Sequence, residues 1–303
     1  MEEVRDGYRW TEQLCPICDA RPTRFLGKRG GASHTAGSGV ETDIWGCGNC
    51  GLIFPDPMPF PVGGLGQHYD SDADEYFHSH DKIAKLESAE GLLRQAEELV
   101  GRAGKILDIG VGRGEVLIKA KERGWHVEGV EPSETFADYA EQRVGVKIWR
   151  MPIEEAEIAP QSFDVVILAA VLEHLYDPDA VIRSIAKVLK PGGFLFVDVP
   201  NEKGLYFKIG NLYNKLRGRD WCVNLAPTFP PFHVFGFSPA SIKRLLEKHG
   251  LRPKRIEVYG GKSVIPVRGG LTGWVERIGG SAVTAISNLG NMGTYIEIWA
   301  EKS

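Results

Sequence analysis

The 303-residue sequence lacks a long hydrophobic run and lacks an excess of positive charge. No apolar segment reaches the roughly 18 residues that a membrane-spanning helix needs, and residues 1–6 are polar where a secretory signal is apolar. The formal net charge of −4 gives no general attraction to nucleic acid or anionic lipid. These absences favour a cytoplasmic protein without a nucleic-acid or membrane partner, and they leave the oligomeric state open.

Cysteine is also scarce, and four of the five cysteines come before residue 62. In a cytoplasmic chain this number indicates metal or thiol chemistry more than a disulfide scaffold. Apolar residues (43%) and charged residues (25%) exclude a disordered or fibrous chain. A proline-rich stretch at 55–61 marks a boundary. We expect a small domain over 1–62, a connecting helical segment over 63–100 and the main domain over 101–303.

Strand-like and helix-like segments alternate in the main domain. The patterns predict strands at 105–109, 126–130, 146–149, 163–168 and 194–199, and helices at 82–100, 115–123, 133–143 and 179–189. This order predicts an α/β fold with a doubly wound parallel sheet. The stretch 201–237 interrupts the order with aromatic residues and prolines. Ser238 and Pro239 then begin another helix that ends at Gly250, and two strands follow at 255–259 and 294–300.

A glycine-rich turn follows the first of these strands. Gly110, Gly112 and Gly114 lie between a predicted strand and a predicted helix, where backbone N–H groups favour a ligand with negative charge. The spacing is G-x-G-x-G, whereas dinucleotide sites use G-x-G-x-x-G. Asp108 can attract an ammonium group, and Glu131 can accept hydrogen bonds from ribose hydroxyls. These residues favour S-adenosylmethionine, with a dinucleotide or a mere tight turn as alternatives.

Five sequence blocks resemble the class I S-adenosylmethionine-dependent methyltransferases. They are 107–114, 130–132, 163–166, 171–175 with 177–178, and 189–193. The resemblance covers residues from about 80 to 303 and implies a Rossmann-like seven-stranded sheet, in which 294–300 is an antiparallel seventh strand beside the fifth. It also implies cofactor contacts: the glycine loop with the methionine part, Glu131 with the ribose, and further residues along the cofactor. Those further residues are Pro132, Met151, Pro152 and Ile153 near the ribose and adenine, and Ala169 and Ala170 beside the sulfonium.

Two C-x-x-C pairs, Cys15 with Cys18 and Cys47 with Cys50, precede the main domain. Four thiolates in a closed tetrahedral shell suit a structural Zn²⁺ ion, although disulfides or free thiols are alternatives. With Tyr69, Tyr76 and Phe77, the pattern resembles the small zinc-binding domain that precedes some bacterial sugar and natural-product methyltransferases. The fifth cysteine, Cys222, is expected to be a buried and inert thiol.

Three residues are candidates for handling the acceptor's proton. His233 lies in the aromatic stretch 201–237, which we expect to cover the site as a lid, and His174 follows Glu173 after the fourth strand. Either histidine can serve as a base or have a packing role. Aromatic residues of the lid are expected to line an acceptor pocket or to pack over the cofactor, and its basic residues to meet phosphate groups or solvent. The aromatic residues are Tyr206, Tyr213, Trp221 and Phe232, and the basic ones are Lys203, Lys208, Lys215, Arg217 and Arg219.

The leading hypothesis is a methyltransferase for a small-molecule acceptor such as a nucleotide-linked sugar. An RNA methyltransferase that grips RNA with the zinc domain is an alternative, and the acidic charge balance counts against it. A cofactor-binding protein without catalysis and a nicotinamide oxidoreductase are further alternatives. The sequence does not identify the acceptor or the atom that is methylated.

Overall fold

The computed structural model describes residues 2–63, 82–260, 287 and 292–303. Tyr69, Tyr76 and Phe77 lie outside the described residues, as does most of the stretch between the last two strands. The domain boundaries expected at residues 62 and 100 stay predictions. Within the described ranges, no helix is both long and apolar enough to cross a membrane.

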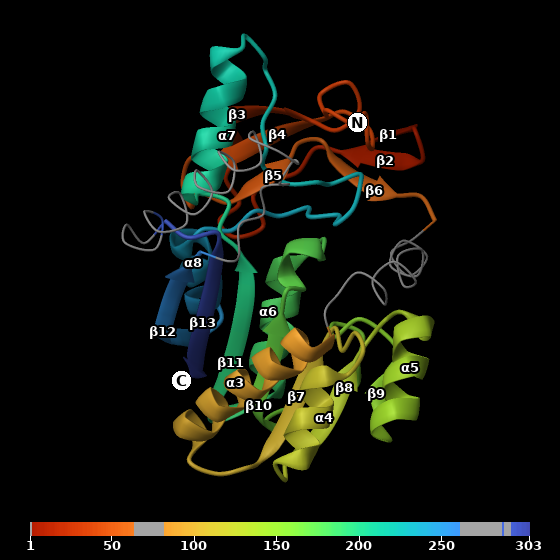
Figure 1. Cartoon of the computed structure of the whole chain (residues 1–303), viewed down its shortest axis with the longest axis vertical. Helices are drawn as coiled ribbons and strands as arrows, with labels where there is room; N and C mark the ends of the chain where they lie inside the picture. Colours follow the sequence, from red (N-terminus) through yellow and green to blue (C-terminus); the bar gives the residue numbers. More distant parts are fainter. Residues whose placement is uncertain (1, 64–81, 261–286, 288–291) are drawn as a thin grey trace, which may run out of the picture.

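A seven-stranded sheet with helices on both faces forms the main body of the chain (Figure 1). Its strand order is β12-β13-β11-β10-β7-β8-β9. The five strands from β11 to β9 are parallel, whereas β13 is antiparallel between β11 and β12. This topology confirms the predicted fold and the antiparallel seventh strand. The strands are β7 (Lys105–Ile109), β8 (His126–Val130), β9 (Ile148–Trp149), β10 (Phe163–Ala169), β11 (Leu189–Pro200), β12 (Leu251–Tyr259) and β13 (Tyr295–Lys302).

Successive strand residues enter two separate cores, one on each face of the sheet. Leu107 and Val197 pack with residues of α6 (Pro178–Val188) and α8 (Pro239–Lys248). Ile106 and Phe196, their chain neighbours, pack with Leu93 of α3 (Lys82–Val100). α4 (Glu115–Glu122) contacts α3, and α5 (Glu134–Val144) packs near β9. Burial on both faces explains the continuous apolar runs in the strands.

Three strand boundaries and one helix depart from expectation. β12 begins at Leu251, four residues before the start expected for it. β11 begins at Leu189 and not at residue 194, because Leu189 already pairs with Phe163. The Pro-Gly-Gly that follows suggests a loop, but a register shift in the β10–β11 pair accommodates it. The strand expected over 146–149 contains two residues only. The lid contains a helix, α7 (Leu205–Leu216), which the sequence pattern did not predict.

The N-terminal residues form two three-stranded sheets. One sheet has the order β1-β2-β6 and the other β3-β4-β5. Figure 1 places both beyond the carboxyl end of β11. We call residues 2–62 the Cys module. The strands are β1 (Glu2–Arg5), β2 (Tyr8–Thr11), β3 (Pro22–Arg29), β4 (Thr42–Cys47), β5 (Ile53–Pro55) and β6 (Met58–Pro61).

The Cys module is joined to the lid by backbone hydrogen bonds. Lys28 donates to the carbonyl of Asp220 (2.7 Å) and accepts from Cys222 (3.0 Å), while Ile53 and Gly236 exchange two bonds of 2.9 and 2.7 Å. A Cβ atom on Gly27 would lie 2.7 Å from the Asp220 oxygen, so this close approach requires glycine. The module and the lid are therefore connected at two sheet edges.

Candidate functional site

The glycine loop has the geometry that a ligand-binding turn requires. Gly110, Gly112 and Gly114 all have positive φ angles (73°, 50° and 78°), and Gly114 is the N-cap residue of α4. The Gly110 N–H donates to the Val130 carbonyl (2.8 Å), which ties the loop to β8. A Cβ atom on Gly110 would lie 2.5 Å from a methyl group of Val171. The loop can therefore keep its conformation only with glycine at this position.

Two buried carboxylates lie beside this loop. Asp108 is 3% exposed and Glu131 is 7% exposed, and a Glu131 oxygen accepts from the Ser133 N–H at 3.0 Å. Burial, together with the charges of Glu131 and Glu115, raises the pKa of Asp108 well above its usual value. A ligand with an ammonium group and hydroxyl donors would stabilise the charged form of both carboxylates. The residues thus fit S-adenosylmethionine.

Glu115 forms an internal ion pair. Its carboxylate accepts from Arg113 Nε at 2.7 Å, and both side chains are almost fully buried. Because Arg113 balances this charge, Glu115 gives little reason by itself to exclude a pyrophosphate from the loop. Asp108 and the G-x-G-x-G spacing still favour the amino-acid-bearing cofactor.

The other predicted cofactor residues follow the ends of neighbouring strands. Pro132 follows β8, and Met151 and Pro152 follow β9, all three half-buried. Ile153 is buried in the main core. Ala169 ends β10, and Ala170 has a φ of 54° while its N–H donates to the Asp198 carbonyl (2.9 Å). All these residues share the carboxyl edge of the parallel sheet, where ligands of such folds bind. Their individual contacts with a cofactor stay predictions.

Glu173, His174 and His233 meet at the same edge, although His233 comes from the distant lid. The Nε2 atoms of both histidines lie 3.9 Å from Glu173 Oε1, and the two imidazole centroids are 4.8 Å apart. The Glu173 carbonyl accepts from the N–H groups of Val234 (2.9 Å) and Phe235 (3.1 Å). These two bonds fix His233 beside the short helix η1 (Leu172–His174).

Burial favours the uncharged forms of Glu173 and His233. It raises the pKa of Glu173 to about 8, with further contributions from Asp198 and Glu202, and it lowers the pKa of His233 to about 3. Glu173 Oε2 is buried and has no hydrogen-bond partner among the described residues. An uncharged imidazole can accept a proton from an acceptor. The three donor atoms also lie within 4.8 Å of one another, a spacing compatible with one divalent cation.

Asp198 is a further residue at this edge, and the sequence analysis missed it. It pairs with Ala169 across the β10–β11 ladder, and its Oδ1 atom is buried without a partner among the described residues. Burial and the facing carboxylate of Glu297 raise the pKa of Asp198 to about 7. A single acidic residue inside the apolar strand 194–199 was the available signal.

The four predicted metal ligands converge in the Cys module. All four Sγ atoms lie within 4.8 Å of one another, with Cys15 and Cys50 at 3.3 Å and Cys18 and Cys47 at 3.5 Å. Tetrahedral zinc with Zn–S bonds of about 2.3 Å separates its sulfur atoms by about 3.8 Å. All four are free thiols, and Gly51, with a φ of 81°, makes the turn after Cys50. The cluster thus fits a Zn²⁺ ion.

The lid residues have varied surroundings. The Lys203 ammonium lies against Gly51, within the electrostatic influence of Cys50 and Cys47, so it belongs to the thiol cluster. Tyr213 is 55% exposed and accepts from Arg217, an arrangement that does not support its place in an acceptor pocket. Cys222 is buried, and burial raises its pKa to about 12, as expected for an inert thiol.

A match to a family model shows the family to which this chain belongs. A family model described as a methyltransferase domain matches residues 80–254, which is more than half of the chain. The chain belongs to the class I S-adenosylmethionine-dependent methyltransferases. The match includes the glycine loop, Glu131, Ala169 and the Glu173–His174 pair. It ends before the last strand and does not include the Cys module.

Curated relatives of this methyltransferase include ubiquinone biosynthesis O-methyltransferases. The protein from Aeromonas salmonicida is 31% identical over 153 residues, which are 48% of this chain and 62% of that protein. The protein from Coxiella burnetii is 30% identical over 166 residues, 53% of this chain and 69% of that protein. The chain thus spans about two thirds of the length of these relatives.

A solved structure supports the fold. The methyltransferase resembles a protein from Thermotoga maritima described as a possible histamine N-methyltransferase, with a TM-score of 0.52 and 20% identity. The likeness covers 79% of this chain and all of that chain. At this identity, it supports the shared fold and nothing about the acceptor.

Proposed function

We propose that this methyltransferase transfers the methyl group of S-adenosylmethionine to a hydroxyl group of a small molecule, such as a nucleotide-linked sugar or another biosynthetic intermediate. The observation that carries the proposal is the meeting of His233, His174 and Glu173 at the sheet edge that also holds the glycine loop. The curated relatives are named ubiquinone biosynthesis O-methyltransferases, which agrees with an oxygen acceptor.

The cofactor supplies a methyl group activated by a cationic sulfur, so the protein has to orient the acceptor and remove its proton. In the proposal, Asp108 and Glu131 hold the ammonium and ribose groups. His233 takes the hydroxyl proton at Nε2. Since burial lowers the pKa of His233, the Glu173 carboxyl, 3.9 Å away, has to stabilise the imidazolium that forms. Glu173 and His174 fix the orientation of His233. The Cys cluster holds a structural Zn²⁺ ion that supports the lid.

The test uses purified protein, methyl-labelled S-adenosylmethionine and a deproteinised small-molecule extract. A parallel reaction receives the RNA fraction. We expect label in the small-molecule fraction, where mass spectrometry shows a gain of one methylene unit on a hydroxyl compound. Label in RNA alone would replace the proposed acceptor class, and label in neither fraction would support a binding protein without catalysis.

A further inference from the structure

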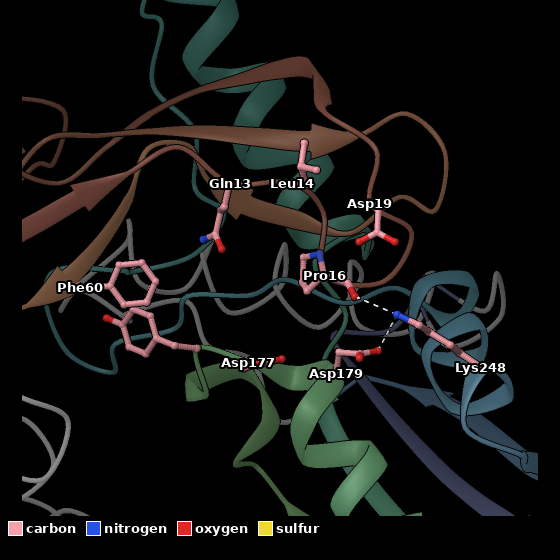
Figure 2. A pocket seen from close by; sticks show the side chains of 9 residues that line it. Gln13, Leu14, Pro16, Asp19, Phe60, Asp177, Asp179 and Lys248 are labelled. Carbon is pink, nitrogen blue, oxygen red and sulfur yellow. Dashed lines mark hydrogen bonds and ion pairs between the residues drawn. The ribbon is translucent and has the colours of Figure 1, made fainter. Parts of the chain in front are cut away.

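A cavity lies where the Cys module meets the main sheet. It has a volume of about 480 Å³ and is lined by the segment around Gln13 and Asp19, by Phe60 of β6, and by the loop that leads into α6 (Figure 2). None of the predicted cofactor, catalytic or metal residues lines it. The cavity is therefore separate from the residues of the proposed reaction site.

One wall of the cavity is aromatic. The rings of Phe60 and Tyr176 pack with centroids 4.9 Å apart and planes inclined by 34°. The Tyr176 hydroxyl donates to the Pro59 carbonyl at 3.0 Å, which fixes this ring between the module and the α6 loop. The wall offers a preformed apolar surface on which a ring-shaped ligand can pack.

The polar atoms of the cavity are mostly acceptors. Asp19 and Asp177 contribute carboxylates, and one Asp177 oxygen accepts from the Ala180 N–H as the cap of α6. The one lining ammonium, Lys248, is 2.8 Å from Asp179 and also donates to the Pro16 carbonyl at 3.4 Å, as Figure 2 shows. Since Lys248 is engaged by Asp179, the remaining charge of the cavity is negative.

Gln13 supplies an unused donor. Its backbone N–H donates to Asp56, while its side-chain Nε2 is buried without a hydrogen-bond partner among the described residues. Leaving such a donor unpaired costs about 1–3 kcal/mol, so the Gln13 side chain, which lines the cavity, gains by turning its amide towards a ligand with an acceptor oxygen. Hydroxyl groups meet both requirements, because they donate to carboxylates and accept from an amide.

The cavity is within reach of the reaction site. Tyr176 and Asp177 follow His174 closely along the chain, and three residues span at most about 11 Å. The cavity and His174 thus share one short segment, near enough for two parts of one acceptor molecule.

We infer that this cavity binds a neutral, hydroxyl-rich ring of the acceptor, a sugar without a phosphate group. The inference rests on the proposed function, because it deepens the choice of acceptor. The negative carboxylates of Asp19 and Asp177 repel phosphate, so a sugar that carries a phosphate directly on its ring fits the cavity less well than an uncharged sugar. The aromatic wall packs on the sugar ring, and Gln13 fixes the orientation of the ring by donating to a ring or hydroxyl oxygen.

The test is saturation-transfer NMR on the full chain with the methyl glycosides of glucose, galactose, mannose and rhamnose, and with glucose 1-phosphate as the charged probe. We expect at least one glycoside to bind, and glucose 1-phosphate to bind more weakly. Gln13→Leu should weaken glycoside binding by about fivefold or more. Asp19→Asn, a change of an exposed side chain that should not disturb folding, should reduce the preference for the uncharged sugar. Glu12→Gln, an exposed neighbour that does not line the cavity, is the matched control.

Absence of binding by every glycoside would overturn the inference, as would unchanged binding in Gln13→Leu or stronger binding of glucose 1-phosphate. These outcomes differ from a failure of the proposed function. A chain that methylates small molecules but binds no glycoside keeps the proposed function and loses this sugar site. A chain that binds glycosides but labels only RNA keeps the sugar site and loses the proposed function.

Discussion

The main sheet and the Cys module hold two different segments in place. The sheet positions the glycine loop, and the Cys module helps to position the lid. The glycine loop stands on strands buried on both faces, and its position follows from local geometry such as the 2.5 Å approach of a Gly110 Cβ to Val171. His233 lies in the lid, which is tied to η1 through Glu173 and to the Cys module through Gly236 and Ile53. We therefore expect cofactor binding to depend on the sheet, and methyl transfer to depend on the Cys module as well.

The largest expected effect comes from His233, which belongs to the lid side of this comparison. His233→Asn should lower kcat by about 10²–10⁴-fold, because a positioned base is lost. Binding of S-adenosylmethionine, measured by calorimetry, should be unchanged. His126→Asn, a change of an exposed histidine on β8, is the control and should keep full activity. A fully active His233→Asn protein would remove His233 from the proposed chemistry.

Gly110→Ala tests the sheet side. Its Cβ would contact Val171 in a backbone conformation that alanine adopts poorly, so we expect a loss of cofactor affinity of about 10- to 100-fold. Gly124→Ala has a similar positive φ of 84° with nothing within 4 Å of the new Cβ. This control variant places an alanine at positive φ without a steric collision. Calorimetry should therefore measure a nearly normal affinity for S-adenosylmethionine. Equal losses in both variants would contradict the role assigned to the loop.

Gly27→Ala tests the connection between module and lid. The new methyl group would collide with the backbone of Asp220 and Cys222 and should separate β3 from the lid. We expect kcat to fall by about 3- to 10-fold while cofactor affinity stays constant, an effect of about 1 kcal/mol. Gly7→Ala, also at positive φ but with free space around it, is the control. A loss of cofactor affinity in Gly27→Ala would show that the two regions are not separable.

The smallest effect concerns stability of the sheet. Burial acts to raise the pKa of Asp164, but hydrogen bonds from Lys190 (2.8 Å) and from the Lys105 N–H (2.8 Å) outweigh it and hold this pKa below its usual value. Asp164 therefore stabilises the fold above about pH 4, and this stabilisation is lost as the pH falls through its native pKa. Asp164→Asn should lower Tm by about 2–4 °C at pH 7, and the difference should shrink towards pH 3 in thermal melts. A difference in Tm that stays the same from pH 7 to pH 3 would rule out a stabilising contribution from the Asp164 charge.

The sequence predicted most of the parallel strands, because glycine or proline lies close to their ends and separates them from the helical segments. Lys105–Ile109 and His126–Val130 are the strands that the pattern predicts, and Ser238 caps α8 as expected. The sequence pattern did not predict the strands of the Cys module. In that module β2 pairs with β6, which is far away in the sequence, and β3 forms backbone hydrogen bonds with the lid. Such pairing depends on contacts between segments far apart in the chain.

The residues of the candidate site were likewise predictable only in part. Cys15, Cys18, Cys47 and Cys50 converge as their spacing predicts, because each pair presents two thiols from one tight turn. The topology places His233 and His174 at one edge of the sheet, but their close approach could not be predicted, since it needs the hydrogen bonds from Val234 and Phe235. Asp198 was not predicted as a site residue, because an acidic residue inside an apolar strand can be assigned to a site only when its spatial neighbours are known.

Removal of the metal tests the central claim most directly. The purified chain is first assayed for zinc, for which the account predicts one ion per chain. A thiol-competing chelator then removes the metal, and cofactor affinity and methyl transfer are measured on the same sample. The account predicts nearly unchanged affinity for S-adenosylmethionine and a large loss of transfer that zinc restores. Loss of both together, or full transfer without metal, would contradict the division between a cofactor site held by the sheet and a catalytic lid held by the Cys module.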